Sequence, residues 1–269
     1  MLCRIDAASM NMGGKLRELG RFELESKTGD KELYRLGGSF IVAINSAHIH
    51  RENLDREIRE DFGVDPGRLV FMSTHRSVSN TPAITFHPIG NYGDAELGGM
   101  PGTLVPSCPE LMTGALLSMS RKDHSGYQVT YEATHHGPHL DTPAMFAEIG
   151  SDENAWNDVG TGMRVAEVLL GMEEAEGTNA IGIGGGHYCA RFKEIAQKRK
   201  VNFGHFVPNH NLPLIDERAA AELIGKSPRT MHFAVHMDRR HQLEIDRVAS
   251  VLEASGLRRL EHSEAEIRL

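Results

Sequence analysis

The sequence predicts an α/β fold, a layered mixed sheet with helices on both faces. One observation is a set of nearly continuous apolar runs, such as Ser39–Ile44, which suit strands buried on both faces. Another is the spacing of Leu54, Ile58 and Phe62, which is typical of a helix with one buried stripe. Strand-like and helix-like segments alternate along the chain, and this alternation is typical of an α/β layered domain.

The first part of the chain is expected to begin with a short strand and a helix. Asp6 or Ser9 is expected to cap that helix, because both side chains accept hydrogen bonds from free backbone N–H groups. The helix then runs to about Leu19. The next helix carries Leu54, Ile58 and Phe62. The expected strands are 1–5, 22–25, 33–36, 39–45, 68–75 and 83–87.

The second part begins with the glycine-rich segment Gly90–Gly102, which is expected to be a loop. A helix starts at Glu110, and a strand covers Tyr127–Thr134. A long loop is then expected through Asp141–Gly150, with Ser151 capping the next helix. The remaining expected elements are a helix with a buried stripe over 165–172, an apolar strand leading into 182–188, a basic helix 191–200, a strand 201–206, a helix 216–224, a strand 231–235, a helix around 245–252 and a short strand within 258–269.

Length and composition favour one α/β domain over 1–269, with an N-terminal sub-domain 1–102 as the alternative. No apolar run reaches the roughly 18 residues of a membrane span, and the N-terminus lacks the apolar region of a signal peptide. The cysteines Cys3, Cys108 and Cys189 are far apart and odd in number. We therefore expect a cytoplasmic protein without disulfides, and the absence of Cys-x-x-Cys excludes a zinc cage of thiolates.

The net charge of −8 requires any nucleic-acid-binding face to be local. One candidate is the basic helix with Lys193, Lys198, Arg199 and Lys200, and another is the pair Arg239–Arg240. A solvated helix face explains the same residues equally well.

The stretch Glu132–Pro138 places two histidines at the end of an expected strand. Strand side chains alternate, so Thr130, Glu132 and Thr134 share one face. Polar groups at a strand end followed by a Gly-Pro break are a common way of presenting catalytic residues. A polar strand end with two surface histidines, His135 and His136, is the alternative.

Two further apolar runs end in the same way, one at His75 and one in Gly182–Tyr188. The glycines do not match the dinucleotide fingerprint or a P-loop, but they permit close approach of a ligand or of another backbone segment. A tight strand-to-helix turn is the structural alternative. The expected substrate-binding residues are Gly184, Gly185, Gly186, Tyr188 and Lys193.

The sequence favours hydrolysis by water. It has no Gly-x-Ser-x-Gly motif, and Cys189 is more typical of a buried, inert thiol. Hydrolysis then needs a base or a metal, together with donors for the oxyanion. The expected catalytic residues are His187, His136 and Glu132, and the expected metal ligands are His135, His136 and His187.

Several motifs in a fixed order carry a family resemblance. They are Asp6–Asn11, Ser73–Ser77, Gly98–Ser107, Glu132–Pro138, Thr142–Ser151 and Gly182–Tyr188. Together they resemble the archaeal and plant type of D-aminoacyl-tRNA deacylase, and the match weakens after Leu212. Gly186 departs from the family pattern, in which a polar residue often precedes the histidine.

The resemblance implies hydrolysis of the ester that joins a D-amino acid to tRNA, as chirality proofreading in translation. It also implies one or two Zn²⁺ ions, a monomer, and a fold related to phosphorylase and peptidyl-tRNA hydrolase proteins. Two alternatives remain open: a tRNA-binding module without catalysis, and a zinc peptidase or nucleoside-phosphorylase-like hydrolase acting on a small substrate.

Three expectations concern geometry. His75, His136 and His187 should lie in one cleft, because strand ends converge at one edge of a sheet. Glu132 should meet a histidine from another strand, such as His187, because four residues along a straight strand separate it from His136 by about 13 Å. The basic side chains of 193–200 should flank the cleft and contact phosphates.

Overall fold

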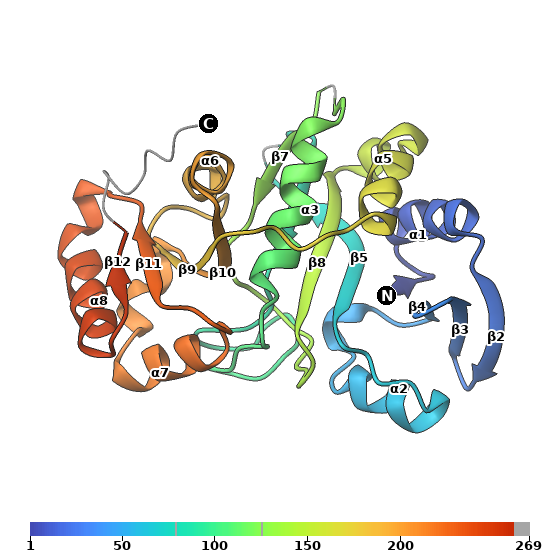
Figure 1. Ribbon diagram of the computed structural model, residues 1–269, viewed down its shortest axis with the longest axis horizontal. Coiled ribbons are helices and arrows are strands. Elements are labelled where there is room, and N and C mark those ends of the chain that lie inside the picture. Colours follow the sequence, from blue (N-terminus) through green and yellow to red (C-terminus); the bar gives the residue numbers. More distant parts are fainter. Residues whose placement is uncertain (79, 125, 261–269) are drawn as a thin grey trace.

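The computed structural model describes residues 1–78, 80–124 and 126–260. The α/β class is confirmed, but the strands form three four-stranded sheets and not one. Figure 1 shows the sheets side by side, with the N-terminal sheet in blue at one end and the C-terminal sheet in orange and red at the other. The single-domain organisation of 1–269 stays a prediction.

The N-terminal sheet has the order β1-β4-β3-β2, and its first helix is capped as predicted. Asp6 accepts a hydrogen bond of 2.7 Å from the Ser9 backbone N–H at the start of α1. The elements are β1 (Leu2–Cys3), α1 (Ala7–Gly20), β2 (Glu23–Thr28), β3 (Lys31–Leu36), β4 (Ser39–Ile44) and α2 (Leu54–Phe62).

The C-terminal sheet has the order β10-β9-β11-β12, and all its strands are parallel. The expected strand in 258–269 is confirmed for its first two residues, and 261–269 lie outside the described residues. The elements are β9 (Thr178–Ile183), α6 (Ala190–Arg199), β10 (Val201–Val207), α7 (Glu217–Gly225), β11 (His232–Val235), α8 (Gln242–Ala254) and β12 (Arg258–Arg259).

The central sheet has the order β5-β8-β6-β7. Strands β5 and β8 run parallel, whereas β6 is antiparallel to β8 and parallel to β7. Helix α3 packs on β10, β6 and β7, and α1 packs on α5 and β5. The elements are β5 (Leu69–Arg76), β6 (Ala83–His87), α3 (Pro109–Arg121), β7 (Gln128–Tyr131), β8 (Ala144–Ser151), α4 (Glu153–Trp156) and α5 (Val159–Leu170).

Strand β8 corrects the expected loop through Asp141–Gly150, because Ala144–Ser151 pairs with strands on both sides. All of its residues are buried, so the strand shows no alternation of apolar and polar residues. Alanine and glycine, which are weak strand formers, further obscured it. The expected cap at Ser151 is also wrong by one residue, since Asp152 accepts the hydrogen bond from Ala155 N.

The central sheet is apolar on one face and polar on the other. Four polar residues form a row across the sheet. Ser73 pairs with Glu148, Glu148 pairs with Thr85, and Thr85 pairs with Thr130. His75, His87 and Glu132 lie two residues beyond members of this row, so they share its face. The opposite face packs into the main core through Met72, Ile84, Phe86, Val129, Tyr131, Met145, Ala147 and Ile149.

Backbone hydrogen bonds join the three sheets at their edges. Met72 N donates to Met1 O at 3.2 Å, which links the central sheet to the N-terminal sheet. Thr134 N donates to Phe206 O at 3.3 Å, which links the central sheet to the C-terminal sheet. None of the helices that the structure describes has both the length and the apolar character needed to cross a membrane.

Candidate active site

The polar face of the central sheet is concave. Strands β5 and β7 are its two edges, so a flat sheet would separate them by three strand spacings, or about 14 Å. His75 Nδ1 on β5 nevertheless lies 2.9 Å from Glu132 Oε1, which directly follows β7. The sheet therefore curves until side chains from its two edges meet above β8 and β6.

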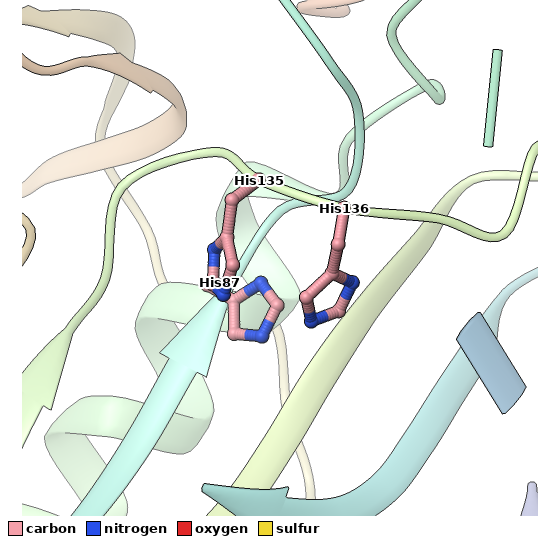
Figure 2. Close-up of side chains that lie close together, drawn as sticks. All are labelled: His87, His135 and His136. Carbon is pink, nitrogen blue, oxygen red and sulfur yellow. The ribbon is translucent and has the colours of Figure 1, made fainter. Parts of the chain in front are cut away.

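Three histidines converge at the ends of β6 and β7, as Figure 2 shows for His87, His135 and His136. Each ring places Nδ1 against a backbone carbonyl, at 3.0 Å from Pro88 O, 2.8 Å from Ala133 O and 2.7 Å from Gly137 O respectively. A carbonyl oxygen only accepts, so Nδ1 carries the proton and Nε2 keeps its lone pair.

Burial keeps these three imidazoles neutral. It lowers the pKa of His87 to about 4 and that of His136 to about 3, and it holds the pKa of His135 well below its ordinary value. The nearby imidazoles would repel further positive charge. At neutral pH the group presents unprotonated Nε2 atoms, which is the form that binds metal.

Glu132 is the buried carboxylate at the centre of the site. Its Oε2 lies 3.5 Å from His187 Nε2 and 3.8 Å from His135 Nε2, and its side chain has no exposed surface. The expected meeting of Glu132 with His187 is confirmed. Burial alone would raise the pKa of Glu132, but the nearby imidazoles of His187 and His75 outweigh it and hold this pKa well below the usual value.

His187 is the most exposed of the clustered histidines His75, His87, His135, His136 and His187. Its side chain is 46% exposed. The hydrogen bond to Glu132 raises the pKa of His187 above its ordinary value, against the effect of partial burial. The raised pKa reflects the stability that the carboxylate gives to the imidazolium.

Glu148 is a site residue that the sequence did not predict. It lies in β8, and its carboxylate is 3.7 Å from both His75 Nδ1 and His87 Nε2. Burial raises the pKa of Glu148 well above its usual value, and the charge of Glu132 adds to this. Recognising β8 as a strand would have revealed it, because a glutamate inside a fully buried strand requires a partner.

The His and Glu side chains form three groups whose ligand atoms lie within 4.8 Å of one another. The expected ligands His135, His136 and His187 are not one of these groups. The structure instead combines His135 and His136 with His87, which ends β6. The groups are His87–His135–His136, Glu132–His135–His187 and His75–Glu132–Glu148.

Two cavities open onto this cluster and share a wall formed by His135, His136, His187 and Leu97. The larger has a volume of about 630 Å³ and also contacts His75 and Glu148. The smaller has a volume of about 360 Å³. The prediction that His75, His136 and His187 lie in one cleft is confirmed, but the reason given for it, convergence of strand ends at one edge of a sheet, is wrong. Strands β5 and β7 run in opposite directions, so the residues meet across a curved face and not at one sheet edge.

Comparison with known proteins now identifies the family. The family model described as D-aminoacyl-tRNA deacylase matches residues 62–260. The chain belongs to the D-aminoacyl-tRNA deacylase family. It is 37% identical over 220 residues to the D-aminoacyl-tRNA deacylase of Pyrococcus abyssi, covering 80% of this chain and 81% of that protein. It is 38% identical over 223 residues to that of Thermococcus kodakarensis, covering 81% of this chain and 82% of that protein.

Other members of the deacylase family are longer. The chain is 38% identical over 208 residues to the D-aminoacyl-tRNA deacylase of Methanoregula boonei, which covers 76% of this chain but 47% of that protein. The fold is also similar to the crystal structure of a conserved protein of unknown function, AF0625. That similarity has a TM-score of 0.87 and 26% sequence identity, and covers 98% of this chain and 95% of the other.

The glycine motif of this deacylase-family chain serves mainly to build a turn. Gly184 and Gly185 have φ values of 90° and 86°, which favour glycine, and an added Cβ on either would collide with His236. Their N–H groups already donate to Val207 O and Asn209 Oδ1. These two N–H groups are therefore already paired, and the expectation that Gly184 and Gly185 bind substrate stays a prediction. Gly186 is exposed, with open space beside its Cα.

Tyr188 acts on the cluster from outside the two cavities. Its hydroxyl lies 2.7 Å from His75 Nε2, and its backbone pairs with Glu132. Tyr188 therefore helps to orient His75, whose other nitrogen faces Glu132. The expectation that Tyr188 binds substrate directly stays a prediction.

The basic helix does not flank the histidine cleft. Lys200 immediately precedes Val201, which pairs with Thr178 at the start of β9. His187 instead follows the end of that strand. The six residues of β9 span about 20 Å. Lys198 and Lys200 line a separate cavity, so their expected place beside the cleft is wrong. Lys193 lines neither histidine cavity and donates to Val129 O at 2.7 Å.

Proposed function

We propose that the chain hydrolyses the ester between a D-amino acid and tRNA, acting as a cytoplasmic monomer. The observation that carries the proposal is the pairing of a fully buried carboxylate, Glu132, with the half-exposed His187 on the wall between two cavities. An ester substrate has a group on each side of its reacting carbonyl, and two cavities that meet at one base suit such a substrate. The names of the relatives supply the substrate class.

The dyad can act as a general base. His187 Nε2 faces Glu132, so a neutral ring donates its Nε2 proton to the carboxylate and leaves Nδ1 as the acceptor. Water attacks the ester carbonyl carbon while its proton passes to His187 Nδ1. The imidazolium that forms is stabilised by Glu132 and then returns a proton to the departing ribose oxygen. The products are the free D-amino acid and tRNA.

The residues present fit a zinc ion at His87, His135 and His136. His87 Nε2 is buried and has no hydrogen-bond partner among the described residues, and burial of such an atom is costly without a ligand. Backbone carbonyls fix all three rings with Nε2 unprotonated, as is usual for zinc-binding histidines. Bound there, zinc would polarise the ester carbonyl and acidify a water molecule.

This arrangement separates roles that the sequence assigned to the same side chains. His135 and His136 would hold the metal with His87, while His187 remains the base. The buried carboxylate of Glu132 argues against a module that only binds tRNA, because desolvating a carboxylate for no chemical purpose is costly.

The test is release of amino acid from matched D-tyrosyl-tRNA and L-tyrosyl-tRNA by the purified chain, with and without a chelator. We expect release from the D substrate and its loss after chelation, with recovery on adding Zn²⁺. Equal rates on both substrates would contradict the stereochemical proposal. Full activity after verified metal removal would contradict the zinc proposal. His241→Ala, at a histidine that lines neither of the two cavities, is the matched control for histidine variants.

A further inference from the structure

The two cavities that share the histidine wall differ in size, charge and apolar character. An aminoacyl ester carries a nucleotide on one side of its reacting bond and an amino acid on the other. If the bond lies at His187, the two halves must enter different cavities. The size and the lining residues of each cavity therefore indicate whether it binds the nucleotide or the amino acid.

The larger cavity offers apolar surface suited to a flat base. Ile5, which lines the larger cavity and not the smaller, is 68% exposed although it is large and apolar. Trp156, the only tryptophan of the chain, also lines this cavity. Its indole N–H donates to His75 O at 3.0 Å, which fixes the ring beside the catalytic cluster. Apolar and aromatic side chains of this kind are the usual contacts of an unstacked base.

The larger cavity also has a cation at its edge. The Arg76 guanidinium lies 4.8 Å from the centre of the Trp156 ring. Throughout 1–78, 80–124 and 126–260, no carboxylate forms an ion pair with Arg76. Two carboxylates line the same cavity, and both already have partners. Asp6 accepts from Ser9 N and Thr74 N, and Glu148 lies 3.7 Å from both His75 Nδ1 and His87 Nε2. Arg76 is thus available to an incoming anion.

The smaller cavity, unlike the larger, has no arginine or lysine in its lining. Asp94 and Glu96 line it, and both are exposed. Carboxylates at this position would repel a phosphate. With a volume of about 360 Å³ against about 630 Å³, this cavity is also the less suitable for a nucleotide.

We propose that the larger cavity binds the terminal adenosine nucleotide of tRNA, with the base against Ile5 and Trp156 and the 5′-phosphate at Arg76. The inference rests on the proposed function, because it takes the reacting ester to lie at His187. It adds the orientation of the substrate across the site. The phosphate contact is formed on the central sheet and not on the basic helix α6.

Trp156 provides a direct reporter, since no other tryptophan contributes to the fluorescence of the chain. The full chain is titrated with adenosine 5′-monophosphate, adenosine and ribose 5-phosphate while tryptophan emission is recorded. We expect saturable change with both adenine compounds, tighter binding of the monophosphate, and much weaker binding of ribose 5-phosphate. No saturable change with the monophosphate, or equal affinity for ribose 5-phosphate, would overturn the proposal.

Two variants with matched controls separate the contacts. Arg76→Ala should weaken binding of the monophosphate about tenfold and leave adenosine unchanged, the usual scale for a hydrogen bond to a charged group. Its control is Arg218→Ala, an exposed arginine on α7. Ile5→Ala should weaken both adenine compounds several-fold through lost apolar contact. Its control is Leu243→Ala, which is 84% exposed on α8. Dissociation constants indistinguishable from those of the controls would overturn the assignment.

The proposal and the proposed function can fail separately. Adenosine 5′-monophosphate should inhibit hydrolysis of D-tyrosyl-tRNA competitively. Saturable, Arg76-dependent nucleotide binding without any hydrolysis of D-tyrosyl-tRNA would remove the proposed function and retain the nucleotide site. Hydrolysis that is unaffected by the monophosphate, in a chain that does not bind it, would retain the function and overturn the orientation proposed here.

Discussion

The three histidines at the ends of β6 and β7 and the single histidine of the glycine turn have the same side chain in opposite environments. His87, His135 and His136 have their Nδ1 atoms bound to carbonyl oxygens, and burial lowers their pKa values. His187 is half-exposed and faces a carboxylate that raises its pKa. Burial and partner, and not residue type, therefore set the protonation of these histidines, and the proposed roles of metal ligand and base follow that difference.

The largest expected effect comes from removing the base. His187→Ala should lower turnover of D-tyrosyl-tRNA by at least about a hundredfold, the usual scale for a lost acid–base group, and leave bound zinc unchanged. Steady-state kinetics and metal analysis of the same preparation check both statements. Loss of zinc in this variant would break the distinction between the two kinds of histidine.

Removing one of the three neutral histidines, in contrast, should weaken the binding of zinc. His87→Ala should weaken zinc binding at least about tenfold, because even indirect partners of a zinc site contribute on that scale. Competition with a chromophoric chelator measures the affinity, with His241→Ala as the control. Unchanged affinity would remove His87 from the metal site and leave Glu132–His135–His187 as the alternative group.

The pH dependence tests the carboxylate that distinguishes His187. A base must be neutral, so turnover is lost as pH falls through the raised pKa of His187. Glu132→Gln removes the main cause of that raised pKa and should move the acidic limb of the kcat profile to lower pH, with a lower plateau. If the acidic limb of the variant stayed at the same pH, a group other than His187 would control it.

Tyr188, the neighbour of His187 in the chain, has its hydroxyl 2.7 Å from His75 Nε2. Tyr188→Phe should lower the free energy of unfolding by about 1 kcal/mol, the usual net value of one hydrogen bond. Urea denaturation followed by circular dichroism measures the change. A stability equal to that of the unmodified chain would show that the hydroxyl contributes nothing to holding His75.

For the basic residues at the end of α6 we expect no effect on tRNA binding. The double variant Lys198→Ala and Lys200→Ala should leave the salt dependence of tRNA binding unchanged, because both residues line a cavity away from the histidines. Filter binding at several salt concentrations checks this. A decrease in the slope of about one per residue would return the phosphate contacts to α6.

Local patterns in the sequence determined most of the elements and several of the chemical groups. Asp6 before an apolar stripe, the basic run after Cys189 and the motif Glu132–Pro138 all depend on neighbours in the chain. Glu132, His135, His136 and His187 could therefore be singled out, and their ordered motifs already resembled the family that the comparisons show. These features can be recognised in the sequence because capping, periodicity and turn formation depend on only a few neighbouring residues.

Only the tertiary structure decided how these groups are arranged around one another. Strand β8 is buried on both faces, so its sequence lacks the alternation that would have identified a strand and placed Glu148 beside His75 and His87. The antiparallel relation of β6 to β8 and the curvature of the central sheet bring His87 to His135 and His75 to Glu132. Register and curvature arise from contacts between residues far apart in the chain, and those contacts also set the burial that separates the neutral histidines from His187.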